Sequence, residues 1–141
     1  MSNFVLKLHE QMLFALLRSS LHGGEPEVAC FEGATADVWQ RCYRLSCAQG
    51  VMALAWDAVM RLPAQLLPPK GVKIMWATAV EAYEQRHQNY CRVVDELAML
   101  YAEHGIATMQ LKGVGLSTLY PVPSHREGGD IDIYTYSLDT T

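Results

Sequence analysis

The sequence lacks the features that mark exported, membrane-spanning and generally nucleic-acid-binding proteins. Its longest apolar run near the start covers residues 12–17, whereas a signal peptide needs about 7–15 apolar residues and a membrane span about 20. Positive charge is also scarce, because 11 lysines and arginines stand against 15 aspartates and glutamates, for a net charge of −4. Non-specific nucleic-acid binding relies on basic surfaces and is therefore not expected. We expect a cytoplasmic protein with no membrane association. A nucleotide bridged by a metal ion remains compatible with this charge, because the metal supplies the positive charge.

Metal-binding and disulfide patterns are also missing from the four cysteines. Cys30, Cys42, Cys47 and Cys91 form no CxxC motif and no Cys/His ligand spacing. We interpret them as reduced thiols that are mostly buried, which is common for free cysteine.

The composition is that of a globular protein, with 50% hydrophobic and 18% charged residues. A length of 141 residues suits one domain or slightly more. Helical spacing of apolar residues, breaker clusters and capping signals predict helices at 4–21, 35–48, 51–61 and 70–104. Thr35 is placed to cap the second of these helices.

The fourth predicted helix is the strongest local signal. Residues 72–104 contain no glycine or proline, and apolar or aromatic residues recur along them at steps of three and four. These positions form one continuous helix face, which is more typical of packing surface than of a cofactor groove. His87 lies on this face and is interpreted as a core histidine.

The pattern changes after Gly105 from helical to mixed. Residues 106–111 and 130–136 read as short strands, separated by a glycine turn at 112–115, a short helix at 116–119 and a loop at 120–129. The predicted fold class is α+β, with a helical region at 1–104 followed by a strand–helix–strand unit at 105–141.

Two carboxylates, Asp130 and Asp132, begin the second predicted strand. Side chains alternate across a strand, so both are expected on one face while Ile131 and Ile133 point into a core. Paired carboxylates suit Mg²⁺ or Mn²⁺ completed by substrate phosphates, and Gly129 allows the backbone to approach such a phosphate closely. The alternative is a polar strand end that faces water.

The glycine turn is the second element of the candidate site. Lys112, Gly113 and Gly115 lie where a strand passes into a helix, and helix starts present free N–H groups to anions. A turn of this kind beside a carboxylate pair is the layout of phosphoryl or nucleotidyl transfer. Lys112 is either a phosphate ligand or an ordinary lysine at a strand end.

Four further residues lie near the candidate site. Arg126 either pairs with a carboxylate or reaches a phosphate. His125 is interpreted as a solvated loop residue. Tyr134 and Tyr136 share the predicted face of Asp130 and Asp132, where one of them either stacks on a base or is simply a half-exposed strand tyrosine.

Together these residues resemble the uncharacterised nucleotidyltransferase-like family of the polymerase-beta superfamily. That family carries a KG turn, a YP-x-P loop, an arginine and a G-D-I-D strand in this order. The matching segments here are Leu111-Lys112-Gly113, Tyr120-Pro121, Pro123, Arg126 and Gly129-Asp130-Ile131-Asp132-Ile133. The helical part is similar in Asp37-Val38-Trp39, Gln49-Gly50-Val51 and Glu103-His104-Gly105-Ile106, so the resemblance spans about residues 35–136.

The resemblance implies transfer of a nucleoside monophosphate from an NTP to an unknown acceptor. It implies catalytic and metal-binding roles for Asp130 and Asp132 with Mg²⁺ or Mn²⁺, and nucleotide contacts from Lys112, Gly113, Gly115, Arg126 and Gly129. The superfamily commonly has a Gly-Ser pair at the glycine turn, whereas Ser117 here lies four residues beyond Gly113. The superfamily also implies a third carboxylate on a later strand, and Asp139 is the only acidic residue after Asp132.

We therefore expect residues 105–141 to be the start of a nucleotidyltransferase-like domain that is truncated and inactive by itself. The alternative is a non-catalytic nucleotide-binding or protein-interaction module that retains the fold. In either case a homodimer through the long helix or the strand edges would cover surfaces that a small two-stranded sheet leaves open.

Overall fold

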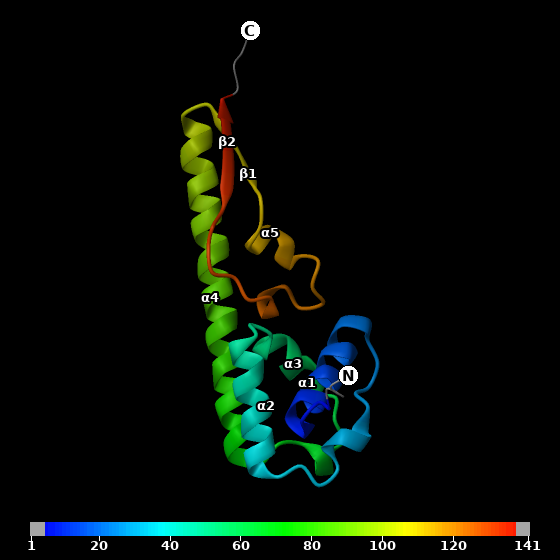
Figure 1. Ribbon diagram of the computed structural model, residues 1–141. Helices are drawn as coiled ribbons and strands as arrows, with labels where there is room; N and C mark the ends of the chain where they lie inside the picture. Colours follow the sequence, from blue (N-terminus) through cyan, green and yellow to red (C-terminus); the bar gives the residue numbers. More distant parts are fainter. Residues whose placement is uncertain (1–4, 138–141) are drawn as a thin grey trace. The chain divides into compact units, whose positions relative to one another are not determined.

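The computed structural model describes residues 5–137, which form a mixed α+β structure (Figure 1). The helices are α1 (Leu8–His22), α2 (Ala36–Ala48), α3 (Met52–Val59), α4 (Lys70–Glu103) and α5 (Val114–Ser117), and the strands are β1 (Ile106–Gln110) and β2 (Ile133–Ser137). Short 3-10 turns lie at Val28–Phe31, Ala64–Leu66 and Pro123–His125. The predicted fold class is confirmed. None of the helices in residues 5–137 combines the length and the apolar character needed to cross a bilayer.

The chain divides into two compact units within α4. The first unit ends at Glu81 and the second begins at Ala82, whereas the sequence pattern suggests a boundary at residue 104. The division falls earlier because side chains of α4 beyond residue 82 hydrogen-bond to the loop that follows α5, as described below.

The first unit has a core of aromatic and aliphatic side chains from α1, α2, α3 and the beginning of α4. Trp76 is fully buried, and its indole N–H donates a hydrogen bond of 2.9 Å to the carbonyl of Met52. Trp39 contacts Trp76 edge-on, with ring centroids 6.4 Å apart, and stacks on Phe31 at 5.5 Å. The prediction that the first part of the long helix face is packing surface is therefore confirmed.

Helix starts follow local hydrogen bonding. Thr35 caps α2 as predicted, because its hydroxyl accepts a hydrogen bond from the backbone N–H of Val38. The first helix begins at Leu8, because the carboxylate of Glu10 accepts the backbone N–H of Lys7 at 2.7 Å and closes the first turn there. The predicted start at residue 4 lies outside the described residues, and residues 5–7, which were also predicted to be helical, are not.

All four cysteines are free, but the prediction that most are buried is wrong. Cys42 alone is buried, Cys30 and Cys91 are half-buried, and Cys47 is exposed. Burial, reinforced by the neighbouring Cys30, raises the pKa of the Cys42 thiol to about 12. Cys42 is therefore a small apolar core residue of α2 rather than a reactive thiol.

The second unit contains an antiparallel sheet of two strands. The register runs from Ile106 opposite Ser137 to Gln110 opposite Ile133. One further backbone hydrogen bond, from the N–H of Leu111 to the carbonyl of Asp132 (3.0 Å), continues this register past the strand ends.

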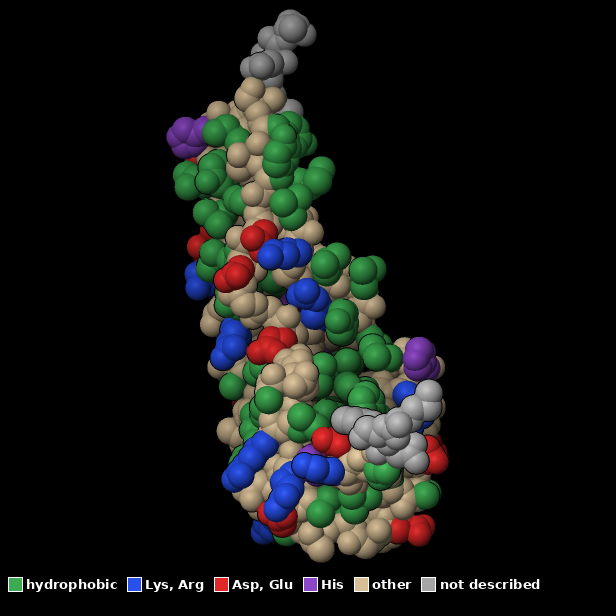
Figure 2. Space-filling view, viewed as in Figure 1, with side chains coloured by type: hydrophobic (Ala, Val, Ile, Leu, Met, Phe, Trp, Pro, Cys, Tyr) green, Lys and Arg blue, Asp and Glu red, His purple; other side chains and the backbone are tan. Residues whose placement is uncertain are grey.

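The two faces of this sheet differ in exposure. Directly opposed residues share a face, so one face carries Met109, Leu111, Tyr134 and Tyr136, which are exposed to between 43% and 56%. Figure 2 shows hydrophobic side chains over β1 and β2, with acidic and basic side chains gathered next to them near the start of β2.

Candidate functional site

The glycine turn after β1 is in direct contact with the segment that carries Asp130. Gly113 is buried and has φ +75° and ψ −124°, a conformation that L side chains disfavour. A Cβ atom at Gly113 would lie 2.9 Å from the backbone carbonyl oxygen of Asp130. Only glycine permits this approach, so the two elements that the sequence singles out do meet in the folded chain.

The turn also starts α5 earlier than predicted. The helix covers Val114–Ser117 instead of residues 116–119, and the N–H of Leu116 donates to the carbonyl of Gly113 at 3.2 Å. Gly115 packs differently from Gly113, since a Cβ there would lie 3.2 Å from the side-chain oxygen of Gln110. A side chain at Gly115 would therefore require the Gln110 side chain to shift by a few tenths of an ångström.

Asp130 and Asp132 lie just before β2 and not within it, so the predicted strand start at residue 130 is wrong. The ladder ends at Ile133, and Asp132 is held one residue further by the hydrogen bond with Leu111. The Oδ2 atom of Asp132 is enclosed and lies 3.2 Å from Nζ of Lys112. Asp130 is exposed, and its carboxylate makes no ion pair or hydrogen bond with the rest of residues 5–137. The two carboxylates thus have different surroundings.

Arg126 secures the glycine turn through carbonyl oxygens. Its Nη1 donates to the carbonyl of Gly113 at 3.1 Å and to that of Glu127 at 3.2 Å, and its guanidinium carbon lies 6.0 Å from the ring centroid of Tyr120. Within residues 5–137 the guanidinium therefore binds backbone carbonyls and pairs with no carboxylate, while its contact with a phosphate stays a prediction. Its remaining N–H groups are available to an anion.

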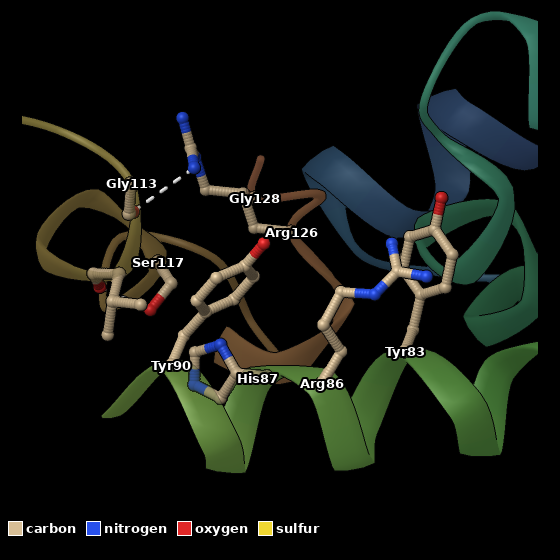
Figure 3. Close-up of a pocket in the computed structure, with 9 residues that line it drawn as sticks. Tyr83, Arg86, His87, Tyr90, Gly113, Ser117, Arg126 and Gly128 are labelled. Carbon is tan, nitrogen blue, oxygen red and sulfur yellow. Dashed lines mark hydrogen bonds between the residues drawn. The ribbon is translucent and has the colours of Figure 1, made fainter. Parts of the chain in front are cut away.

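The loop between α5 and β2 is fastened to α4 by hydrogen bonds that the sequence does not reveal. The hydroxyl of Tyr83 donates to the Glu127 carboxylate at 2.7 Å, and that of Tyr90 donates to the carbonyl of Gly129 at 2.9 Å. Figure 3 shows Tyr83 and Tyr90 rising from α4, with Tyr90 directed toward the loop. The only signal for this role is the change from tryptophan to tyrosine along the helix face, since tyrosine adds a hydroxyl to an apolar ring.

His125 is buried, so its interpretation as a solvated loop residue is wrong. It is 7% exposed, and its Nε2 lies 2.9 Å from a carboxylate oxygen of Glu84 on α4. His87, interpreted as a core residue, is half-buried, and its Nε2 lies 3.5 Å from Sγ of Cys91. A small cavity of about 10 Å³ lies between α4 and the glycine turn (Figure 3), which is about the volume that holds one water.

A cleft of about 170 Å³ joins the glycine turn to the carboxylates. It is lined by Lys112, Gly113, Arg126, Glu127, Gly128, Gly129, Asp130 and Asp132. Of the residues singled out from the sequence for a phosphate and metal site, only Gly115 is missing from its walls. Two cations and two carboxylates in one cleft suit a phosphate group bound with a metal ion.

The donor set fits a divalent cation that needs phosphate oxygens to complete its shell. Mg²⁺ is commonly held by one or two carboxylates together with substrate phosphates, and Asp130 and Asp132 supply that number. Within residues 5–137 no group of three or more His, Cys, Asp or Glu side chains is placed to hold a metal. Asp139, the one acidic residue after Asp132, lies outside the described residues.

The chain matches the model of a protein family. The family model described as "Uncharacterised nucleotidyltransferase" matches residues 35–140. The match includes α2, α3, α4 and the whole cleft, and it confirms the resemblance carried by the KG turn and the G-D-I-D segment. No curated protein and no solved structure matches the chain.

Proposed function

The chain belongs to the uncharacterised nucleotidyltransferase family, and on that premise we propose that it contributes the cleft of an enzyme that transfers a nucleoside monophosphate from an NTP to an acceptor, with Mg²⁺ or Mn²⁺. The observation that carries this proposal is the cleft of about 170 Å³ in which Lys112 and Arg126 meet Asp130 and Asp132. An arrangement of fixed charges around a phosphate-sized space is what nucleotidyl transfer requires, because its catalysis consists mostly of positioning and charge stabilisation.

The triphosphate would be held by the two cationic side chains of the cleft, Lys112 and Arg126. Lys112 exchanges its ion pair with Asp132 for a phosphate oxygen, and Arg126 contributes the N–H groups that are not used on Gly113 and Glu127. Asp130 and Asp132 would hold the divalent cation, which neutralises phosphate charge when it is bound. The absence of a side chain at Gly113 lets the glycine turn pack directly against the carbonyl of Asp130.

The proposed reaction is a displacement at the α-phosphorus. A hydroxyl oxygen of the acceptor bonds to the α-phosphorus while the bond from phosphorus to the oxygen of pyrophosphate breaks. Pyrophosphate leaves with that bonding pair, and the hydroxyl proton passes to a carboxylate of the cleft. In-line approach of the acceptor requires an open side, and Asp130 is exposed on that side.

A binding and transfer experiment tests the proposal. The full chain is titrated with Mn²⁺ and each of the four NTPs, while free Mn²⁺ is followed by its paramagnetic resonance signal and pyrophosphate release is followed with candidate hydroxyl acceptors. Asp130→Asn and Asp132→Asn should each weaken NTP-dependent Mn²⁺ binding by at least about tenfold, because each removes one charged ligand. Asp95→Asn on the exposed surface of α4 changes the net charge equally and should bind as the unmodified chain does.

The outcomes separate the proposal from its alternative. NTP binding with no pyrophosphate release on any acceptor would favour a nucleotide-binding module without catalysis. Equal Mn²⁺ and NTP binding by Asp130→Asn, Asp132→Asn and Asp95→Asn would refute the assignment of the cleft itself.

A further inference from the structure

The sheet has an apolar face that residues 82–137 of the second unit leave about half exposed. Met109 and Leu111 from β1 and the following turn lie on it with Tyr134 and Tyr136 from β2, and Tyr134 is 56% exposed. A contiguous apolar face of this kind, rimmed by charged residues, marks a binding surface more often than a scattered apolar residue does. We therefore expect a ligand or a partner to cover this face.

The face is continuous with the cleft through the strand register. Asp132 is opposite Leu111, two residues before Tyr134, so its side chain belongs to the same face. At about 3.4 Å per residue, Tyr134 lies about 7 Å along the strand from Asp132 and Tyr136 lies about 14 Å away. A ligand anchored at Asp132 therefore meets Tyr134 first.

The size of the cleft says which part of a nucleotide it can enclose. Pockets that bury most of a small organic ligand measure about 300–1,000 Å³, whereas this cleft measures about 170 Å³. Its lining is charged residues and glycines, with no aromatic ring among them. It has the chemistry and the volume for the phosphates of a nucleotide, and the base has to lie outside it.

We propose that the base of the bound NTP stacks on Tyr134, on the sheet face that adjoins the cleft. This inference rests on the proposed function and adds the place of the base to it. The rings of Tyr134 and Tyr136 are themselves stacked, with centroids 6.0 Å apart and planes 28° apart. Tyr136 thus supports the Tyr134 ring from one side and leaves its other surface for a ligand.

The chemistry of the face predicts weak base preference. Met109 and Leu111 present no hydrogen-bond donor or acceptor from their side chains, apart from the weakly accepting thioether. A tyrosine ring stacks on any base, because every base has a π-face. All four NTPs should therefore bind, with purines favoured over pyrimidines by their larger stacking area.

The test compares a nucleotide with its phosphates alone. The full chain with Mn²⁺ is titrated by calorimetry with inorganic tripolyphosphate and with an ATP analogue whose α,β-bridge resists cleavage. The unmodified chain should bind the analogue at least about tenfold more tightly than tripolyphosphate, which is the range that base stacking on an aromatic ring supplies. Tyr134→Ala should lose that difference while keeping its affinity for tripolyphosphate, and Tyr134→Phe should keep both.

The design distinguishes this inference from the function on which it rests. Retained binding of tripolyphosphate shows that Tyr134→Ala is folded at the cleft. If Tyr134→Ala still prefers the analogue as the unmodified chain does, the base site is wrong and the phosphate cleft stands. If the unmodified chain binds neither ligand, the proposed function fails and the base site fails with it. A dimer in light scattering that dissociates on Tyr134→Ala would instead make this face the contact between two copies and overturn the inference.

Discussion

Gly113 is the position at which one methyl group should do most damage to the second unit. Alanine at this position must adopt φ +75° and ψ −124°, at a cost of about 1–3 kcal/mol for a non-glycine residue. Its Cβ would also lie 2.9 Å from the carbonyl oxygen of Asp130, and both partners are backbone atoms, which cannot rotate away as a side chain does. Relief of that overlap adds a cost similar to overpacking a core, about 1–3 kcal/mol. We expect Gly113→Ala to destabilise the second unit by about 2–6 kcal/mol.

Two other glycines separate the contributions to this loss. Gly105 has φ +71° with nothing within 4 Å of a built Cβ, so Gly105→Ala incurs the conformational cost alone, about 1–2 kcal/mol. Gly129 lines the same cleft as Gly113 without a positive φ or a close neighbour. Gly129→Ala should therefore stay within about 0.5 kcal/mol of the unmodified chain.

The assay has to report on the second unit. The three tryptophans are Trp39, Trp56 and Trp76, all in the first unit, so their fluorescence does not follow the cleft. Amide hydrogen exchange read by mass spectrometry on peptides covering 106–117 and 130–137 does. A loss of about 2–6 kcal/mol corresponds to exchange faster by about 30- to 25,000-fold. Equal exchange in Gly113→Ala and Gly105→Ala would refute the reasoning, because the contact with the Asp130 carbonyl would then cost nothing.

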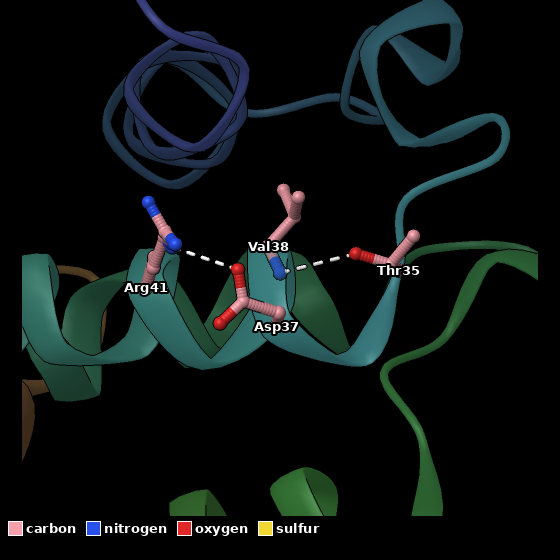
Figure 4. A network of polar contacts seen from close by, with 4 residues as sticks. All are labelled: Thr35, Asp37, Val38 and Arg41. Carbon is pink, nitrogen blue, oxygen red and sulfur yellow. Dashed lines mark hydrogen bonds and ion pairs between the residues drawn. The ribbon is translucent and has the colours of Figure 1, made fainter.

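Three further predictions concern the first unit. Trp76→Phe leaves the buried carbonyl of Met52 without its 2.9 Å donor and opens a cavity, so urea denaturation followed by circular dichroism should show a loss of about 2–4 kcal/mol. Thr35→Ala removes the α2 cap (Figure 4) and should cost about 0.5–1 kcal/mol, at the weak end for caps because the hydrogen bond is 3.4 Å long. In the native chain an aromatic disulfide reagent should modify Cys47 readily and Cys42 only after denaturation, because Cys42 is buried with a pKa raised to about 12. The same raised pKa means that the unfolded chain loses this proton first, so unfolding free energy should fall by up to about 1.4 kcal/mol per pH unit from about pH 9 toward 12.

Control variants exist for the cap and for the alkaline slope, and a small loss would contradict the prediction for Trp76. Arg41→Ala beside the α2 cap removes an exposed ion pair with Asp37 and should change stability by less than Thr35→Ala does. Cys42→Ala should flatten the alkaline decrease in stability, and an unchanged slope would contradict the assigned cause. A loss below about 1 kcal/mol for Trp76→Phe would mean that the Met52 carbonyl finds another donor.

The helices could be predicted because their signals are local. The long helix was located within a residue of its observed ends, since a 34-residue run at helical spacing admits no other periodic structure. The cap at Thr35 was also readable, because a cap depends on residues within one turn. The shift of α5 from residues 116–119 to Val114–Ser117 shows the limit. There the helix start is fixed by the contact of Gly113 with Asp130, which is 17 residues away in the sequence and leaves no local mark.

The contacts between α4 and the loop after α5 could not be predicted either, because their partners are far apart in the sequence. Whether Tyr90 reaches a carbonyl or merely fills space depends on where the loop after α5 passes, and that path is decided by Arg126 binding the carbonyl of Gly113. Likewise His125 is buried because Glu84 lies across from it on α4. A single sequence contains the residues of such pairs but not their pairing.

The two carboxylates of the cleft differ in their surroundings, and this difference affects cation binding. A strict strand alternation makes Asp130 and Asp132 equivalent, but the strand begins only at Ile133 and their surroundings differ. Asp132 is fixed in the register and already neutralised by Lys112, whereas Asp130 stands exposed on the segment that Gly113 touches. A cation that arrives with an NTP must displace Lys112 from Asp132 but meets no such competitor at Asp130. Lys112→Met should therefore strengthen Mn²⁺ binding without nucleotide and weaken tripolyphosphate binding, because the same ammonium group opposes the first and supports the second. A change of both affinities in the same direction would show that Lys112 serves only one side of the cleft.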